Sequence, residues 1–111
     1  MGISISSKLD TTLGHIGNIF NWVIRVESDG KLEIEFPEIK NNDENISVRR
    51  ESLTQNELFF EKKFEIIFWD TGRFNTPKYQ IIINEPEGEK SYIDVPNSII
   101  NIISNPSIAN N

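Results

Sequence analysis

Alternation of apolar and polar side chains over residues 20–36, interrupted only by Val23 and by the turn at residues 28–30, constrains the fold of this chain more than any other feature. The stretch from Asn21 to Phe36 reads NWVIRVESDGKLEIEF. Successive side chains of a strand point to opposite faces, so most apolar residues of each half fall on one face, while Val23 falls on the other with Asn21, Arg25 and Glu27. The residues of the apolar face are Phe20, Trp22, Ile24 and Val26 in the first arm and Leu32, Ile34 and Phe36 in the second. The pattern predicts two half-buried strands, which are typical of an antiparallel sheet.

The turn at Asp29-Gly30 sets the expected register of the two arms. A two-residue loop would place carboxylates opposite apolar side chains, and a slip of one residue reverses every side chain. A three-residue loop over residues 28–30 avoids this, with Gly30 in the left-handed position that such loops need. The predicted pairs are Val26 with Leu32, Ile24 with Ile34, Trp22 with Phe36, Arg25 with Glu33, and Glu27 with Lys31.

The rest of the chain predicts an α+β fold in a single small domain over residues 1–111. Apolar residues at helical spacing indicate a short helix over Lys8–Ile16, and a cap at Asn97 or Ser98 followed by four isoleucines indicates a second helix that ends at Pro106. Between them, alternation predicts strands near residues 46–49, 63–69, 79–83 and 92–95. We expect an antiparallel sheet or partial barrel of five or six strands closed by these terminal helices, with residues 105–111 as a frayed tail.

Charge and composition bound the function classes. The chain has 111 residues, a net charge of −6 and no cysteine. The absence of cysteine removes disulfides, thiol catalysis and cysteine-based metal sites. Negative charge disfavours nucleic acids and anionic membranes but is compatible with a basic protein partner. The basic doublets Arg49-Arg50 and Lys62-Lys63 are interpreted as protection of strand edges. With no secretory signal and no long apolar run, we expect a cytoplasmic protein.

No group of residues has the spacing of a catalytic or metal site. His15 is the only histidine, and the glycines at 14 and 17 do not form a phosphate-binding motif. Asp43 and Glu44 lack the alternating oxygen ligands of a calcium loop. The acidic stretch over residues 85–89 predicts an exposed turn. We therefore expect a protein that is not an enzyme and that needs no cofactor or metal.

The remaining candidates are residues that could bind a protein partner. The expected acidic strand face and the aromatic loop after residue 68 have the composition of binding surfaces. The candidates are Glu27, Glu33, Glu35, Trp69, Asp70, Arg73 and Phe74. The favoured hypothesis is a binding module, such as an inhibitor or immunity-type protein, that covers a basic site of a partner. The alternative is an accessory subunit that docks through an apolar surface of Trp69, Ile67 and Ile82, and self-association is left open.

Overall fold

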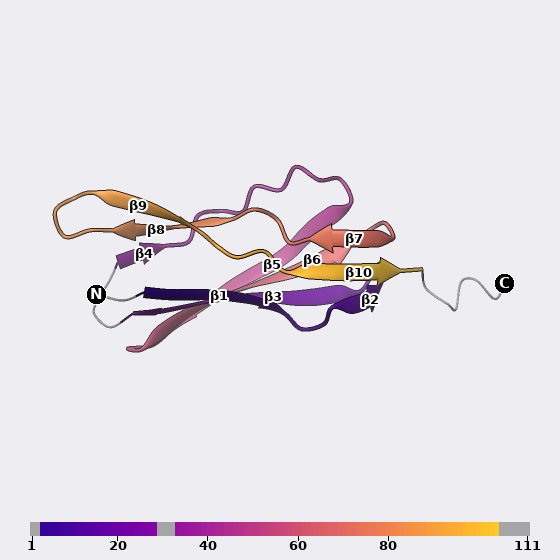
Figure 1. The fold of residues 1–111 in the computed structure, drawn as a ribbon, viewed down its shortest axis with the longest axis horizontal. Helices are drawn as coiled ribbons and strands as arrows, with labels where there is room; N and C mark the ends of the chain where they lie inside the picture. The colour runs from indigo at the N-terminus through magenta and orange to yellow at the C-terminus, as the bar shows by residue number, and fades with distance from the viewer. Residues whose placement is uncertain (1–2, 29–32, 105–111) are drawn as a thin grey trace.

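The computed structural model describes residues 3–28 and 33–104, and ten strands lie in these ranges (Figure 1). The strands are β1 (Ile3–Leu9), β2 (Leu13–His15), β3 (Ile19–Ser28), β4 (Glu33–Glu35), β5 (Ile46–Gln55), β6 (Phe59–Phe68), β7 (Gly72–Asn75), β8 (Gln80–Asn84), β9 (Lys90–Asp94) and β10 (Ile99–Ile103). The predicted turn at Asp29-Gly30 and the predicted frayed tail over residues 105–111 lie outside the described ranges.

The α+β prediction is wrong, because the described residues contain no helix and the fold is all-β. Residues 8–16 form the end of β1 and the short strand β2, and Gly14 within this stretch and Gly17 just after it weaken any helix. Ile99–Ile103 form β10, in which Ile100 and Ile102 are buried while Ile99 and Ile103 are exposed. Isoleucine is β-branched and favours strands. The segment therefore forms a strand with alternate side chains buried, although its isoleucines also have helical spacing. Across the described ranges, no helix is long and apolar enough to cross a membrane.

The strands form two layers. One layer is the four-stranded sheet, with strand order β1-β3-β6-β5 and antiparallel pairing throughout. The second layer consists of two three-stranded sheets, β2-β10-β7 and β4-β8-β9, which lie one after the other along the four-stranded sheet (Figure 1). Most pairs in the second layer are antiparallel, but β10 runs parallel to β2. The molecule is therefore a β-sandwich with a divided second layer.

The predicted pairing of the two alternating arms is wrong, although the predicted buried face of the first arm is correct. Strand β3 pairs with β1 and β6, whereas β4 crosses to the other layer and pairs with β8. Val26 lies opposite Ile5 and Phe60, and Ile34 lies opposite Ile83. The long strands β1 and β6 satisfy both edges of β3, so its apolar side chains can be covered by the second layer instead of by a hairpin partner.

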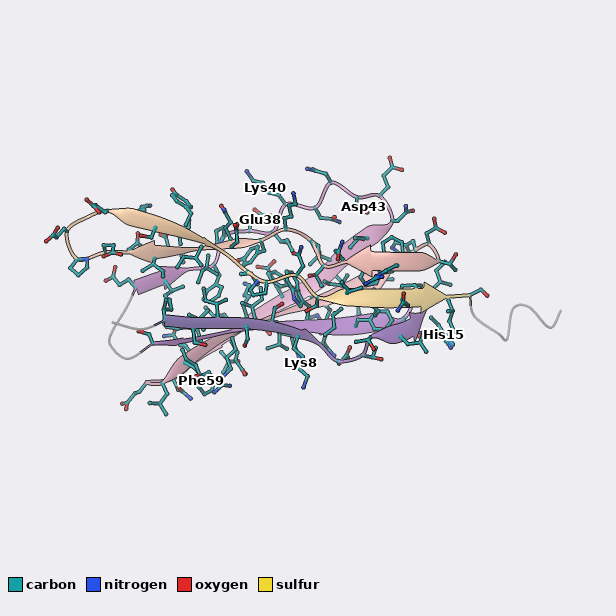
Figure 2. All side chains as sticks on the ribbon, viewed as in Figure 1. Lys8, His15, Glu38, Lys40, Asp43 and Phe59 are labelled. Carbon is teal, nitrogen blue, oxygen red and sulfur yellow. The ribbon has the colours of Figure 1, made fainter. Side chains whose placement is uncertain are left out.

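Aromatic rings join the layers at the centre of the sandwich. The ring centroids of Trp22 and Phe64 in the four-stranded sheet are 5.4 Å apart, and Tyr79 of the second layer lies 6.4 Å from Trp22 and 5.3 Å from Phe64. At one end, Phe68 packs against Phe74, with centroids 5.2 Å apart. Figure 2 shows side chains filling the space between the two layers. One core cluster includes residues of all three sheets.

Gly14 provides a second point of contact, between β2 and the four-stranded sheet. The ring of buried Phe20 lies directly against Gly14, and a Cβ atom at this position would collide with the ring. Close approach of this kind is a common reason for glycine within a strand. Gly14 therefore allows β2 and its partner β10 to pack closely against the core.

The first prediction concerns this contact. Gly14→Ala should lower the free energy of unfolding by about 1–3 kcal/mol, because the added methyl overpacks the core. Chemical denaturation measures the loss. In the double variant Gly14→Ala, Phe20→Leu, the smaller leucine leaves room for the added methyl group. The double variant should therefore lose less unfolding free energy than the sum of the two single losses. Strict additivity would show that the two residues do not touch.

The two tryptophans give a second prediction. Trp22 is fully buried, whereas Trp69 is 50% exposed. Trp22→Ala should cost about 3–5 kcal/mol of unfolding free energy, because it leaves a cavity in the core. Trp69→Ala, the matched control, should cost no more than about 1 kcal/mol. Equal losses in urea denaturation would contradict the placement of Trp22 between the layers.

Candidate functional site

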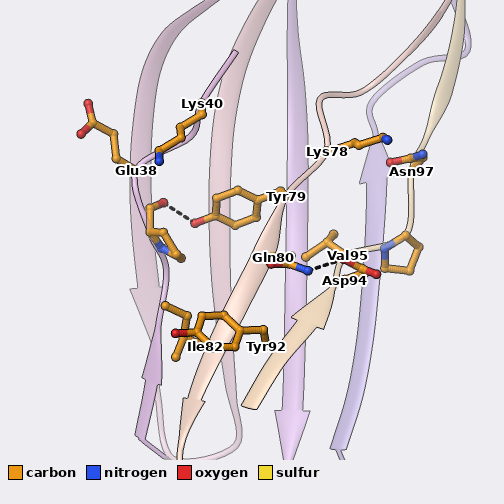
Figure 3. Close-up of a pocket in the computed structure, with 12 residues that line it drawn as sticks. Glu38, Lys40, Lys78, Tyr79, Gln80, Ile82, Tyr92, Asp94, Val95 and Asn97 are labelled. Atoms are coloured by element: carbon orange, nitrogen blue, oxygen red, sulfur yellow. Dashed lines mark hydrogen bonds between the residues drawn. The ribbon is translucent and has the colours of Figure 1, made fainter. Parts of the chain in front are cut away.

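An open groove of about 810 Å³ lies on the outer side of the second layer, where β8 and β9 leave their sheet (Figure 3). Its floor is formed by side chains of β8 and β9, namely Gln80, Ile82, Tyr92 and Asp94. The chain from Pro37 to Lys40, between β4 and β5, forms one wall. Val95–Asn97, between β9 and β10, form the other. We call this feature the β8 groove.

Alternation along β8 and β9 explains the floor. Ile81 and Ile83 point into the core and are buried, so Gln80 and Ile82 face outward. Ile82 lies between two cross-strand neighbours, Tyr92 on β9 and Glu35 on β4. Tyr92 is 60% exposed. The floor therefore offers an isoleucine and an aromatic ring to a ligand.

Tyr79 fixes the first wall to the core. Its ring is buried against Trp22 and Phe64, and its hydroxyl donates a hydrogen bond of 2.6 Å to the carbonyl of Pro37. The carbonyl of Tyr79 in turn accepts a 2.9 Å hydrogen bond from the backbone N–H of Val95, at the second wall. One core residue thus ties both walls together.

Polar contacts with neighbouring strands fix the second wall further. The Ser7 hydroxyl on β1 donates a hydrogen bond to the carbonyl of Pro96 and lies 3.2 Å from the Ser98 hydroxyl. The backbone N–H of Ser98 donates to the hydroxyl of buried Thr76, and the backbone N–H of Thr76 donates to the Ser98 carbonyl, both at 2.9 Å. A groove with walls held in this way is largely formed before any ligand arrives.

Several side chains that line the groove carry hydrogen-bond donors without an acceptor in the described ranges. On the floor, the amide of Gln80 donates to the carboxylate of Asp94 at 2.8 Å, so these two groups partly satisfy each other (Figure 3). Lys40, Lys78 and Asn97 also line the groove. Within the described ranges, the side chains of these three residues have no hydrogen-bond or ion-pair partner.

The predicted acidic face is divided between the two layers. Glu33 and Glu35 lie on β4, on the outer surface that continues into the groove floor, and Glu35 lies 3.8 Å from Lys90. Glu27 lies on β3 in the four-stranded sheet. The fold thus places two of the three predicted glutamates on the surface beside the β8 groove, where Glu35 neighbours Ile82, and separates the third.

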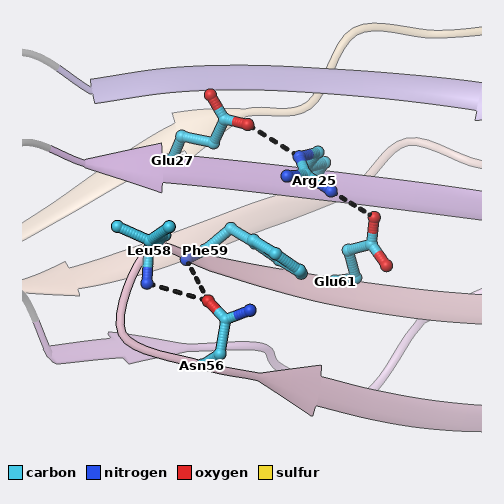
Figure 4. Close-up of polar contacts among 6 residues, drawn as sticks. All are labelled: Arg25, Glu27, Asn56, Leu58, Phe59 and Glu61. Carbon is cyan, nitrogen blue, oxygen red and sulfur yellow. Dashed lines mark hydrogen bonds and ion pairs between the residues drawn. The ribbon is translucent and has the colours of Figure 1, made fainter.

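Glu27 belongs to a different cluster (Figure 4). Arg25 forms 2.7 Å ion pairs with Glu27 and Glu61, and its guanidinium stacks 3.8 Å from the centre of the Phe59 ring. One guanidinium neutralises only one of the two carboxylates, so the cluster keeps a net negative charge, but both carboxylates are held in ion pairs with Arg25.

The predicted aromatic loop forms no continuous surface. Trp69 is half exposed and its indole N–H donates to the Ser47 hydroxyl at 2.7 Å, while Phe74 is half-buried against Phe68. The Asp70 carboxylate accepts a 2.8 Å hydrogen bond from the backbone N–H of Thr71, and Arg73 is exposed on β7. Phe74 therefore packs as part of the core boundary, and Trp69 remains available to a partner.

The sequence analysis missed the groove residues Tyr79, Tyr92 and Asn97 and the wall at Pro37. The available signal was the outward position of the apolar residue Ile82 between the two inward isoleucines of β8. No three His, Asp or Glu side chains in the described part of the chain gather as a metal site would require.

Comparisons with known proteins show a similar fold and no family. No protein-family model and no curated protein matches the chain. Among solved structures, it is similar to the cohesin module from a Clostridium perfringens family 33 glycoside hydrolase, with a TM-score of 0.50 and 9% identity. The match covers 91% of this chain and 98% of that one. At this identity the likeness establishes the β-sandwich fold alone.

The environment of Tyr79 predicts how stability depends on pH. Burial raises the pKa of the phenol, and the nearby carboxylate of Glu51 adds to the shift. The unfolded chain therefore loses this proton near the ordinary phenol pKa of about 10, before the folded protein does. The contribution of the protonated Tyr79 phenol to folding stability is fully present below about pH 10 and is lost as the pH rises further.

Tyr79→Phe should cost about 1 kcal/mol at neutral pH, through loss of the hydrogen bond to Pro37. The same variant should lose less stability than the wild type between about pH 9 and pH 11, as followed by urea denaturation. Tyr92→Phe is the control and should keep the wild-type pH profile. Parallel profiles for all three proteins would contradict the burial of the Tyr79 hydroxyl.

Proposed function

We propose that this chain is a non-catalytic protein-binding module whose β8 groove receives an extended segment of a partner protein. The observation that carries the proposal is the groove floor, where Ile82 and a 60% exposed Tyr92 lie beside each other between two fixed walls. Exposed aromatic and apolar side chains in a concave, preformed site are typical anchors of protein recognition.

The geometry favours an extended ligand over a helix or a small molecule. The groove is open and follows the direction of β8, from Tyr92 and Ile82 at one end to Lys78 and Asn97 at the other (Figure 3). An extended chain can place alternate side chains on such a floor while its backbone meets polar groups on the walls. The likeness to a cohesin module, a protein-docking module, supports a binding role for this fold, although fold alone does not assign function.

The test is selection of binding peptides from a random library displayed on phage, with the 111-residue chain as the target. Selected peptides should lose about tenfold or more in affinity for Tyr92→Ala and for Ile82→Ser, since each removes an anchor. They should bind Trp69→Ala, the control on the other layer, with unchanged affinity. Peptides that bind all four proteins equally would refute the groove as the site.

The inhibitor or immunity-type form of this proposal is supported by the net charge of −6 and by exposed Glu33 and Glu35. Glu27 contributes less, because it is paired with Arg25. In this form the partner carries basic residues next to the bound segment, and the protein acts in the cytoplasm by covering that site. Binding should then weaken as salt increases.

A second candidate function is an accessory subunit that docks through an apolar surface on the four-stranded sheet. Trp69 and Ile19 are half exposed, and Ile67 lies between them as the cross-strand neighbour of Ile19 and Ser47. Ile82 lies on the other layer and does not extend this surface.

Sedimentation velocity tests the self-associating version of this second candidate. The wild type should form an oligomer at micromolar concentration, and Trp69→Ala should remain monomeric. Tyr92→Ala, which alters only the β8 groove, should associate as the wild type does. A wild type that stays monomeric at all concentrations would refute the self-associating form of the accessory-subunit function.

A further inference from the structure

The unpaired polar groups of the β8 groove define what kind of segment it can hold. Lys40, Lys78 and Asn97 line the upper part of the groove in Figure 3, and their side-chain donors have no partner in the described part of the chain. The Tyr92 hydroxyl is likewise unpaired there. The carboxylate of Asp94, an acceptor on the floor, is already bonded to Gln80. Glu38 also lines the groove, and its carboxylate has no partner in the described ranges. Two ammonium groups, an amide and a phenol stand against this one free carboxylate, so the groove offers more unpaired donors than acceptors.

A ligand that matches such a groove must supply acceptors and few donors. An ordinary strand carries one backbone N–H for each carbonyl and would leave many of its donors without partners. A segment rich in proline has carbonyls but lacks most backbone N–H groups. In the polyproline II conformation these carbonyls point away from the axis and are not bonded within the segment.

The apolar part of the groove is compatible with the same ligand. Ile82 and Tyr92 form the apolar part of the floor, and the walls contribute the rings of Pro37 and Pro96. Proline rings of a polyproline II segment dock onto aromatic side chains of this kind, and the rigid segment loses little conformational entropy on binding. Fixed walls keep the corresponding cost to the protein low.

Charge gives the bound segment a direction. Glu35 lies beside Ile82 at the lower end of the groove, and Glu33 follows on the same face of β4. Glu35 is only loosely compensated, since its contact with Lys90 is 3.8 Å long and both side chains are half exposed. Lys40 and Lys78 lie toward the opposite end together with Glu38, so these three side chains carry one net positive charge there (Figure 3). A basic residue is therefore favoured at the Glu33–Glu35 end of the ligand and disfavoured at the other.

We infer that the β8 groove binds a proline-rich segment of a partner protein in the polyproline II conformation, with an arginine or lysine next to Glu33 and Glu35. This inference rests on the proposed function, because it names the class of segment that the same groove takes. It also gives the expected basic partner a specific place on the molecule.

The experiment uses the full chain labelled with ¹⁵N and three synthetic peptides. The first has two prolines separated by two residues, with an arginine at one end. The second replaces both prolines with alanine, and the third moves the arginine to the other end. Isothermal titration calorimetry gives the affinities, and backbone amide shifts locate each bound peptide. A neutral oligosaccharide is titrated in parallel, as a ligand rich in both donors and acceptors.

The first peptide should shift amides of β8, β9 and residues 95–97 and should bind at least about tenfold more tightly than the other two. Glu33→Lys, Glu35→Lys should weaken it about tenfold and remove its salt dependence. Glu27→Lys, the control on the other layer, should leave its affinity unchanged.

The other possible outcomes distinguish the proline-rich assignment from the proposed protein-binding function. If the alanine peptide binds in the groove as tightly as the first, the proline-rich assignment is overturned while the proposed protein-binding function stands. If the oligosaccharide shifts the groove amides and no peptide does, both are overturned. Peptide-induced shifts confined to β3 and β6 would also overturn both, because the ligand would then occupy the four-stranded sheet.

Discussion

The contact of Tyr79 with Trp22 and Phe64 is the interaction on which the rest of the structure depends. The three rings meet at the centre of the sandwich and hold the divided second layer onto the four-stranded sheet. Since the same tyrosine bonds to Pro37 through its hydroxyl and to Val95 through its carbonyl, core packing also sets the shape of the β8 groove. Stability and binding are therefore linked through one side chain.

Local alternation in the sequence predicted which side chains would be buried, but not which strands would pair. The inward face of β3 and the buried residues of β6 and β8 follow directly from period-two spacing. Pairing depends on which distant strands compete for the same edge, and β1 and β6 displaced β4 from β3. The isoleucines over residues 99–103 fit either period, and contact with β2 and β7 decides in favour of a strand.

The site was harder to predict because its parts come from three separate segments of the chain, residues 37–40, 78–82 and 92–97. Pro37, Tyr79, Tyr92 and Asn97 meet only after β4 crosses to the second layer. Individual charges were also misplaced. Lys62 was interpreted as edge protection, yet it lies on the central strand β6, buried and paired with Glu51 at 2.9 Å. Period-two spacing along β6 places Lys62 on the same face as Phe64 and Ile66, so its inward position could have been predicted from the strand pattern.

The central claim is that ligands of this module lie on the floor of the β8 groove. The most direct test is measurement of intermolecular nuclear Overhauser effects between the full chain and a bound peptide that was selected without bias. The account predicts cross-peaks from the Tyr92 ring and the Ile82 methyl groups to the peptide. Cross-peaks to Trp69 and Ile19, or to Phe59, with none to Tyr92, would contradict it.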